Sequence, residues 1–76
     1  MNKSRRKALE AISAKVRELH DELDTLREEE QEYLDNMPES LQDGEKGDVA
    51  QVAIDAMEEA MTALEEAASQ LDTASE

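Results

Sequence analysis

Two pairs of acidic residues, each with a spacing of three, are the residues of this sequence best suited to chemistry. Glu29 and Glu32 form one pair, and Asp55 and Glu58 form the other. A spacing of three brings two side chains to one face of a helix, and carboxylates that converge inside a helical bundle can hold Mg²⁺ against phosphate groups. Asp55 and Glu58, however, lie on the side of their predicted helix that faces away from its apolar residues. We therefore expect no magnesium site.

The spacing of these pairs resembles the paired acidic motifs with which all-helical nucleotide pyrophosphohydrolases hold magnesium. That resemblance implies a Mg²⁺-dependent enzyme of the same kind. The sequence departs from the pattern because no cluster of lysines accompanies the carboxylates. We keep such an enzyme as a distant alternative, and the leading expectation is a protein without enzymatic activity and without a cofactor.

Other polar residues also indicate no catalytic or metal site. Arg17 stands three residues before His20, where carboxylate-bridged metal bundles carry a Glu, so His20 is expected to contact a carboxylate at the rim of a helix interface. The sequence has no cysteine nucleophile, and none of its five serines has a base at an informative spacing. Asp43, Glu45 and Gly47 have part of the spacing of a calcium loop but lack its remaining ligands.

Length and composition restrict the classes of protein to which the chain can belong. At 76 residues it is at most one domain, and chains this short usually need a disulfide, a metal or self-association for a secure margin of stability. There is no cysteine, no apolar run of membrane-spanning length and no signal-peptide pattern, so we expect a cytoplasmic protein that does not bind membranes. The net charge of −13 disfavours direct binding to nucleic acid and favours basic proteins as partners.

The first helix is predicted from an apolar stripe with alternating spacings of three and four, which is the a/d pattern of a heptad repeat. Pro38 should end this helix at about residue 36. Glu30 interrupts the pattern at a stripe position, where we expect its side chain to lie in the helix interface opposite Ala53. The stripe consists of Leu9, Ile12, Val16, Leu19, Leu23, Leu26, Tyr33 and Met37.

The second helix carries two neighbouring stripes, which together form a face wider than one partner helix requires. The larger side chains are Ile54, Met57, Met61, Leu64 and Leu71, flanked by Ala50 and Ala68. The smaller side chains are Val49, Ala53, Ala56, Ala60, Ala63 and Ala67. We therefore expect the second helix to contact at least two neighbours.

These patterns predict an all-α fold, an antiparallel two-helix hairpin that dimerises into a four-helix bundle. We expect one domain over 1–76, with helix 1 at about 4–36, a connection at 37–45, helix 2 at about 46–72 and a frayed tail at 73–76. Residues whose numbers add to about 83 should face each other. In the connection, a short helical turn at 38–42 should place Leu41 over the end of the bundle.

The helix ends are predicted from capping residues and from charge. Asn2 or Ser4 is a candidate N-cap for the first helix, and Asp43 or Asp48 for the second. Half of the eight basic residues lie in the segment 3–7, at a helix N-terminus where the macrodipole disfavours cations. We expect attraction to the acidic tail at 72–76 to compensate for this placement.

The junction Asp35-Asn36-Met37-Pro38-Glu39-Ser40-Leu41-Gln42, with an Ala/Glu-rich helix after it, resembles small acidic proteins encoded by bacteriophages and prophages. The basic start and the Glu run before the junction belong to the same pattern. The resemblance implies a phage accessory protein, and therefore a location in the cytoplasm of a bacterial host. It carries over no site residues.

We therefore expect a non-enzymatic, homodimeric protein that binds a basic host or defence protein through its acidic surface. The candidate binding residues are Glu58, Glu59, Glu65, Glu66, Pro38 and Leu41. The alternative is a structural or scaffolding hairpin of a phage particle that only self-associates.

Overall fold

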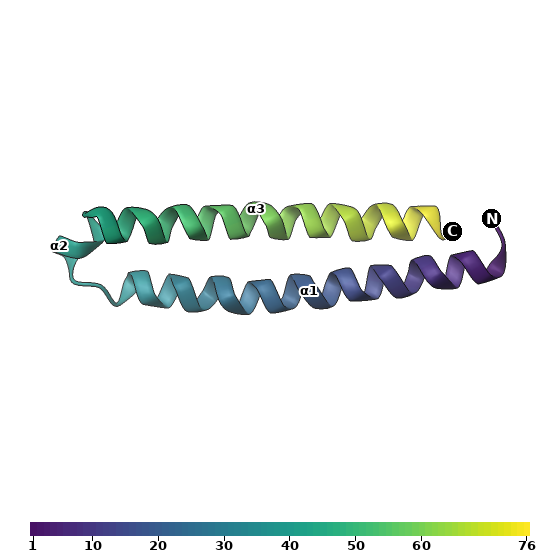
Figure 1. The fold of residues 1–76 in the computed structure, drawn as a ribbon, viewed down its shortest axis with the longest axis horizontal. Coiled ribbons are helices and arrows are strands. Elements are labelled where there is room, and N and C mark those ends of the chain that lie inside the picture. Colours follow the sequence, from purple (N-terminus) through teal and green to yellow (C-terminus); the bar gives the residue numbers. More distant parts are fainter.

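The structure, a computed structural model, describes residues 1–76 and contains only helices. α1 spans Lys3–Asp35, α2 spans Glu39–Gln42 and α3 spans Glu45–Ala74. α1 and α3 lie side by side and run in opposite directions, and α2 joins them at one end of a rod 59 Å long (Figure 1). None of the three helices combines the length and the apolar composition that a membrane-spanning helix requires. The predicted all-α class is confirmed.

The N-terminus of α1 is capped by a side chain. The Oδ1 atom of Asn2 accepts a hydrogen bond from the backbone N–H of Arg5 at 2.7 Å, which supplies a partner to one of the unpaired N–H groups of the first turn. Asn2, rather than Ser4, is therefore the N-cap. At the other end, α1 stops at Asp35, and the chain turns through Asn36 into Pro38.

The connection between the long helices is held by Gln42. Its Nε2 atom donates hydrogen bonds to the carbonyl oxygen of Leu34, in the last turn of α1, at 3.2 Å and to that of Met37, just after α1, at 2.9 Å. The short helix α2 occupies the segment in which a helical turn was expected. Leu41 remains 45% exposed, so it covers the end of the helix pair only partly.

The start of α3 differs from both capping predictions. Its N-cap is Gly44, which makes no side-chain hydrogen bond. Asp43 instead ends α2 as its C-cap, and Asp48 already lies in the first turn of α3. Both candidates were wrong because the short helix α2 uses Asp43 and α3 begins directly after it.

Gly47 is the point at which α3 passes closest to the connection. A Cβ atom added there would lie 1.9 Å from the carbonyl oxygen of Gln42. The same addition at Gly44 would meet nothing closer than 3.5 Å. The close approach of two backbone segments, and not an unusual backbone conformation, therefore requires glycine at position 47.

The contact between the long helices extends along most of their length. Ser13 bonds Asp72 and His20 bonds Glu65, so residues at the same level have numbers that add to 85, close to the expected sum of about 83. Toward the connection, a small core contains Leu34, Met37, Ala50 and Ile54. The buried and half-buried residues of α3 are Gly47, Ala50, Ala53, Ile54, Met57, Met61, Leu64, Ala68 and Leu71.

α1 is rotated so that only part of its apolar stripe faces α3. Leu9, Val16, Leu23 and Met37 are buried or half-buried. The remaining members of the stripe are about half exposed: Ile12, Leu19, Leu26 and Tyr33. A helix with one neighbour can bury only one narrow strip. In α1 this strip consists of heptad position a, the series that begins at Leu9, and position e, the series that begins at Ser13, instead of positions a and d. Only seven of the 76 residues are buried, so a large apolar surface remains in water.

Candidate functional site

Most of the exposed apolar residues of the two long helices lie along one side of the helix pair, here called the apolar edge. On α1, its members recur every seven residues and therefore lie on one side of the helix. On α3, its members recur at spacings of three and four. The apolar edge consists of Ile12, Leu19, Leu26 and Tyr33 of α1 and Val49, Ala53, Ala56, Ala60, Ala63 and Ala67 of α3.

The two halves of the apolar edge lie next to each other. Tyr33 of α1 and Val49 of α3 line the same shallow groove, together with Glu30, Lys46 and Ala50. Because each half keeps to one side of its helix, the adjacency at Tyr33 and Val49 continues along the pair. Glu30 is half-buried beside Tyr33, at the margin of the apolar surface.

The opposite side of the helix pair, here called the ion-paired edge, is closed by polar contacts between α1 and α3. Its first cluster joins Ser13, Arg17 and Asp72. The Ser13 hydroxyl donates to Asp72 Oδ1 at 2.8 Å and accepts from Arg17 Nη1 at 2.6 Å, and the guanidinium also forms an ion pair with Asp72. The Arg17 guanidinium, followed by the Ser13 hydroxyl, holds the pKa of Asp72 below its ordinary value of 3.8.

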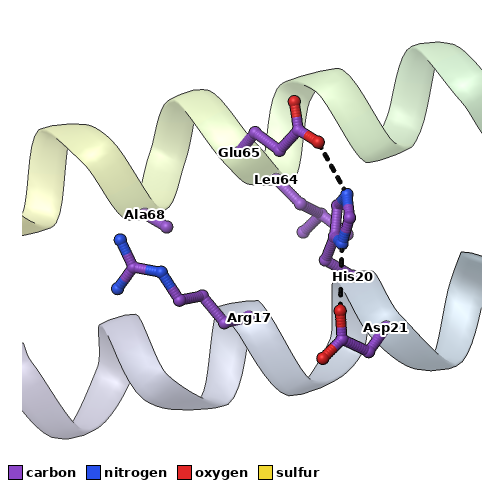
Figure 2. Close-up of a pocket in the computed structure, with 6 residues that line it drawn as sticks. All are labelled: Arg17, His20, Asp21, Leu64, Glu65 and Ala68. Carbon is purple, nitrogen blue, oxygen red and sulfur yellow. Dashed lines mark hydrogen bonds and ion pairs between the residues drawn. The ribbon is translucent and has the colours of Figure 1, made fainter.

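The second cluster of the ion-paired edge is centred on His20 (Figure 2). Its Nε2 atom lies 2.8 Å from Glu65 Oε1 of α3, and its Nδ1 atom lies 3.4 Å from Asp21 Oδ1. Hydrogen bonding to Asp21 is the largest cause that raises the pKa of His20 above 6.5, with Glu65 adding to it and desolvation opposing it. The shorter contact is nevertheless the one to Glu65. His20 thus contacts carboxylates at the rim of an interface, as its position predicted.

Further along the ion-paired edge, Arg27 forms an ion pair with Asp24 on its own helix at 2.8 Å. Hydrogen bonding to Asp24 raises the pKa of Arg27, and the charge of Glu58 across the edge contributes to the shift. Arg27, Glu58 and Glu65 line one open groove with Met61 and Thr62. Of the three Lys and Arg residues of α1 after position 7, Arg17 and Arg27 therefore lie on this edge, together with His20.

The acidic residues expected to bind a partner are exposed on α3. Glu58 and Glu65 flank the ion-paired edge, whereas Glu59 and Glu66 lie one residue further round the helix and make no ion pair. Pro38 and Leu41 are exposed in the connection, at one end of the rod. The structure therefore separates the candidate residues into a long acidic face and a terminal loop.

The expected attraction between the basic start and the acidic tail is not present. Lys3, Arg5, Arg6 and Lys7 form no ion pair, and Asp72 bonds Arg17 and Ser13 instead. The expectation was wrong because Arg17 lies at the level of Asp72, while the basic residues lie beyond it toward the N-terminus.

The carboxylate pairs considered for magnesium do not converge. Glu29, Glu32, Asp55 and Glu58 are all exposed, and Asp55 accepts a hydrogen bond from Gln51 at 2.9 Å. No group of three or more His, Cys, Asp or Glu side chains lies close enough together to hold a metal ion.

Sequence reasoning missed three structural residues, Ser13, Leu34 and Gln42. Leu34 belongs to the small core but not to the predicted a/d stripe. Ser13 is 2% exposed and lies inside the helix contact, although it falls outside the a/d stripe. Its heptad position, e, is shared with His20 and Arg27, and this recurrence of polar residues beside the stripe was the available signal. Gln42 carried no comparable signal, because its carbonyl partners are defined by the turn itself.

A scan against protein-family models and searches of curated proteins and of solved structures found no match for this chain.

Proposed function

We propose that this protein binds another protein and catalyses no reaction. In this proposal, the chain is an antiparallel helical hairpin that pairs with a second copy as a four-helix bundle and presents acidic outer faces to a basic partner. The observation that carries the proposal is the division of the surface. One edge of the helix pair is apolar and has no partner within the chain, while the opposite edge and the outer faces are polar and mostly acidic.

Self-association follows from the apolar edge. Leu19 and Leu26 are 52% and 56% exposed, and each lies beside alanines of α3 that are exposed as well. Contiguous apolar surface of this extent marks an interface in soluble proteins. A second copy would remove this surface from water and leave both ion-paired edges at the outside of the bundle.

The acidic faces define the chemistry of the partner. Each chain has a net charge of −13, and a dimer doubles that charge. A field of this sign steers basic proteins toward the surface and repels phosphate backbones. The proposed partner is a basic protein of a bacterial host, such as a nucleic-acid-binding or defence protein, and the chain acts as a phage accessory protein in the host cytoplasm.

The experiment is capture of partners from bacterial lysate on the immobilised protein, followed by titration of the captured protein at increasing salt. We expect a basic partner whose affinity falls steeply with salt, because screening weakens charge pairs. Charge reversal at Glu59 and Glu66, which make no ion pair, should weaken binding without changing helicity or mass. An affinity that does not change with salt or with these charge reversals, but is lost when Leu41 is altered, would contradict binding through the acidic face. It would indicate that the partner binds the connection between the long helices.

The second candidate function is structural, a self-associating component of a phage particle. The length of the apolar edge favours it, since this surface extends over most of the rod. Capture of virion proteins instead of basic host proteins would support this candidate.

A further inference from the structure

The apolar edge is divided unevenly between its two helices. The α1 half carries the large side chains Ile12, Leu19, Leu26 and Tyr33, each seven residues after the one before. The α3 half carries alanine at every position except Val49. One half is therefore a row of projections, and the other half is a shallow channel.

The large residues of α1 lie at levels that fall between successive small residues of α3. Residues at the same level have numbers that add to 85, as the Ser13–Asp72 and His20–Glu65 contacts establish. The level of Leu26 therefore falls between Ala56 and Ala60 of α3. By the same register, Leu19 falls between Ala63 and Ala67, and Tyr33 falls between Val49 and Ala53.

The geometry points to a dimer in which the two-fold axis runs parallel to the helices, so that the connections of both copies lie at the same end. This inference rests on the proposed self-association and specifies how the two copies are oriented in the dimer. A rotation about such an axis places α1 of one copy over α3 of the other without shifting the levels. Leu19, Leu26 and Tyr33 of α1 then each enter a hole between two apolar residues of the partner's α3, in the manner of knobs-into-holes packing.

The alternative dimer has its two-fold axis across the helices and places the connections at opposite ends. In that arrangement α1 packs on α1 and α3 packs on α3. Large residues such as Leu19 and Leu26 would then meet large residues, while alanines would meet alanines. The two helix pairs would require different separations within the range of about 8 to 10 Å, so one of them would be packed poorly.

The area of the apolar edge is sufficient for a dimer. From Ile12 to Tyr33, α1 rises about 32 Å at 1.5 Å per residue, and two adjacent helices are about 20 Å wide. This corresponds to roughly 600 Å² on each copy, or about 1,200 Å² in total, at the lower end of the range for stable interfaces.

Charge opposes the same-end arrangement only weakly. It brings the basic segments 3–7 of both copies to one end, where they repel each other. These segments belong to helices on the diagonal of the bundle, about 14 Å apart for helices spaced by 10 Å. Ions screen exposed charges beyond about 8 Å at physiological salt, so packing decides the arrangement.

The test is a distance measurement between spin labels in the dimer. The chain has no cysteine, so Ser40→Cys in the connection and Ser4→Cys at the opposite end each introduce one labelling site on an exposed residue. Pulsed electron paramagnetic resonance should give a distance of about 20 to 30 Å between the two copies for each variant, because both ends of the bundle are then only helix diameters wide. Dilution with unlabelled protein should remove the dipolar signal.

Distances near the 59 Å length of the rod for both variants would overturn the same-end dimer and leave the proposed self-association intact. A missing dipolar signal together with a monomer mass in light scattering would overturn the arrangement and the dimer together. Circular dichroism of each labelled variant verifies that the helices are retained.

Discussion

The two edges of the helix pair are built from the same two helices, yet they differ in what they leave for a partner. On the ion-paired edge, Ser13, Arg17 and His20 each bond an acidic residue of α3. On the apolar edge, no side chain has an equivalent neighbour, and Leu26 is 56% exposed. The side chains of the ion-paired edge have their partners within one chain, whereas the apolar edge leaves apolar side chains exposed to water.

This difference distinguishes the polar contacts that the chain completes by itself from the apolar surface that it leaves exposed. Polar contacts close one edge, and the rotation of α1 at which they form also packs Leu9, Val16 and Leu23 toward α3. That rotation turns the stripe beginning at Ile12 toward the other edge, where burial of apolar surface contributes roughly 25 cal/mol per Å². Under the proposed self-association, the second copy would bind at the apolar edge and leave the ion-paired edge uncovered.

The largest effect is expected when the apolar edge is broken by Leu26→Asp. A carboxylate placed in the interface has no cationic partner, so association should weaken by at least about 3 kcal/mol, more than a hundredfold. Light scattering over a dilution series measures the change. Val52→Asp is the matched control, because Val52 is 68% exposed on α3 outside the apolar edge, and it should leave the dimer mass unchanged. A Leu26→Asp protein that remains dimeric would show that the apolar edge is not the interface.

A smaller effect is expected at Gly47, which helps to set the register of the two edges. In an ordinary helix, Gly→Ala gains about 0.5 to 1 kcal/mol. Gly47→Ala should instead lower the free energy of unfolding by about 1 to 3 kcal/mol, because the new methyl group would overlap the backbone of Gln42. Urea denaturation followed by circular dichroism measures this change. Gly44→Ala has room for its methyl group, and although alanine is a poorer N-cap than glycine, we expect it to be less destabilising than Gly47→Ala.

The ion-paired edge is tested by Ser13→Ala. The substitution removes a buried hydroxyl that bonds Asp72, and the free energy of unfolding should fall by about 1 kcal/mol while the dimer mass stays the same. Ser69→Ala, at an exposed serine of α3, is the control and should change stability little. Loss of the dimer in Ser13→Ala, at a concentration where the Ser69→Ala protein is dimeric, would contradict the independence of the two edges.

The smallest effect concerns pH. The folded pKa of His20 is raised above 6.5, so protonated His20 stabilises the fold. This contribution is fully present below about pH 6.5, the unfolded pKa, and is lost as the pH rises through the folded pKa. The thermal midpoint should therefore fall as the pH rises above 6.5, and this part of the fall should be absent in His20→Gln. Identical pH profiles for the two proteins would show that the His20 contacts do not contribute.

The sequence predicted the helical character of the chain and the inner stripe of α3 better than it predicted the rotation of α1. On α3, the large residues from Ile54 to Leu71 are the ones that face α1. On α1, the a/d stripe has two sides, and either side could have faced α3. The choice depends on polar residues such as Ser13, whose partner Asp72 is 59 residues away.

The sequence by itself determined that two long helices form, because apolar spacings of three and four, a proline between them and an acidic exterior are local properties of the chain. It also determined that more apolar surface exists than one helix contact can bury. Only the tertiary structure decided which residues remain exposed. That decision depends on the level at which the helices meet, set by Gly47 against Gln42 and by the bonds of Ser13 and His20 to α3, and these contacts exist only once the two helices lie together.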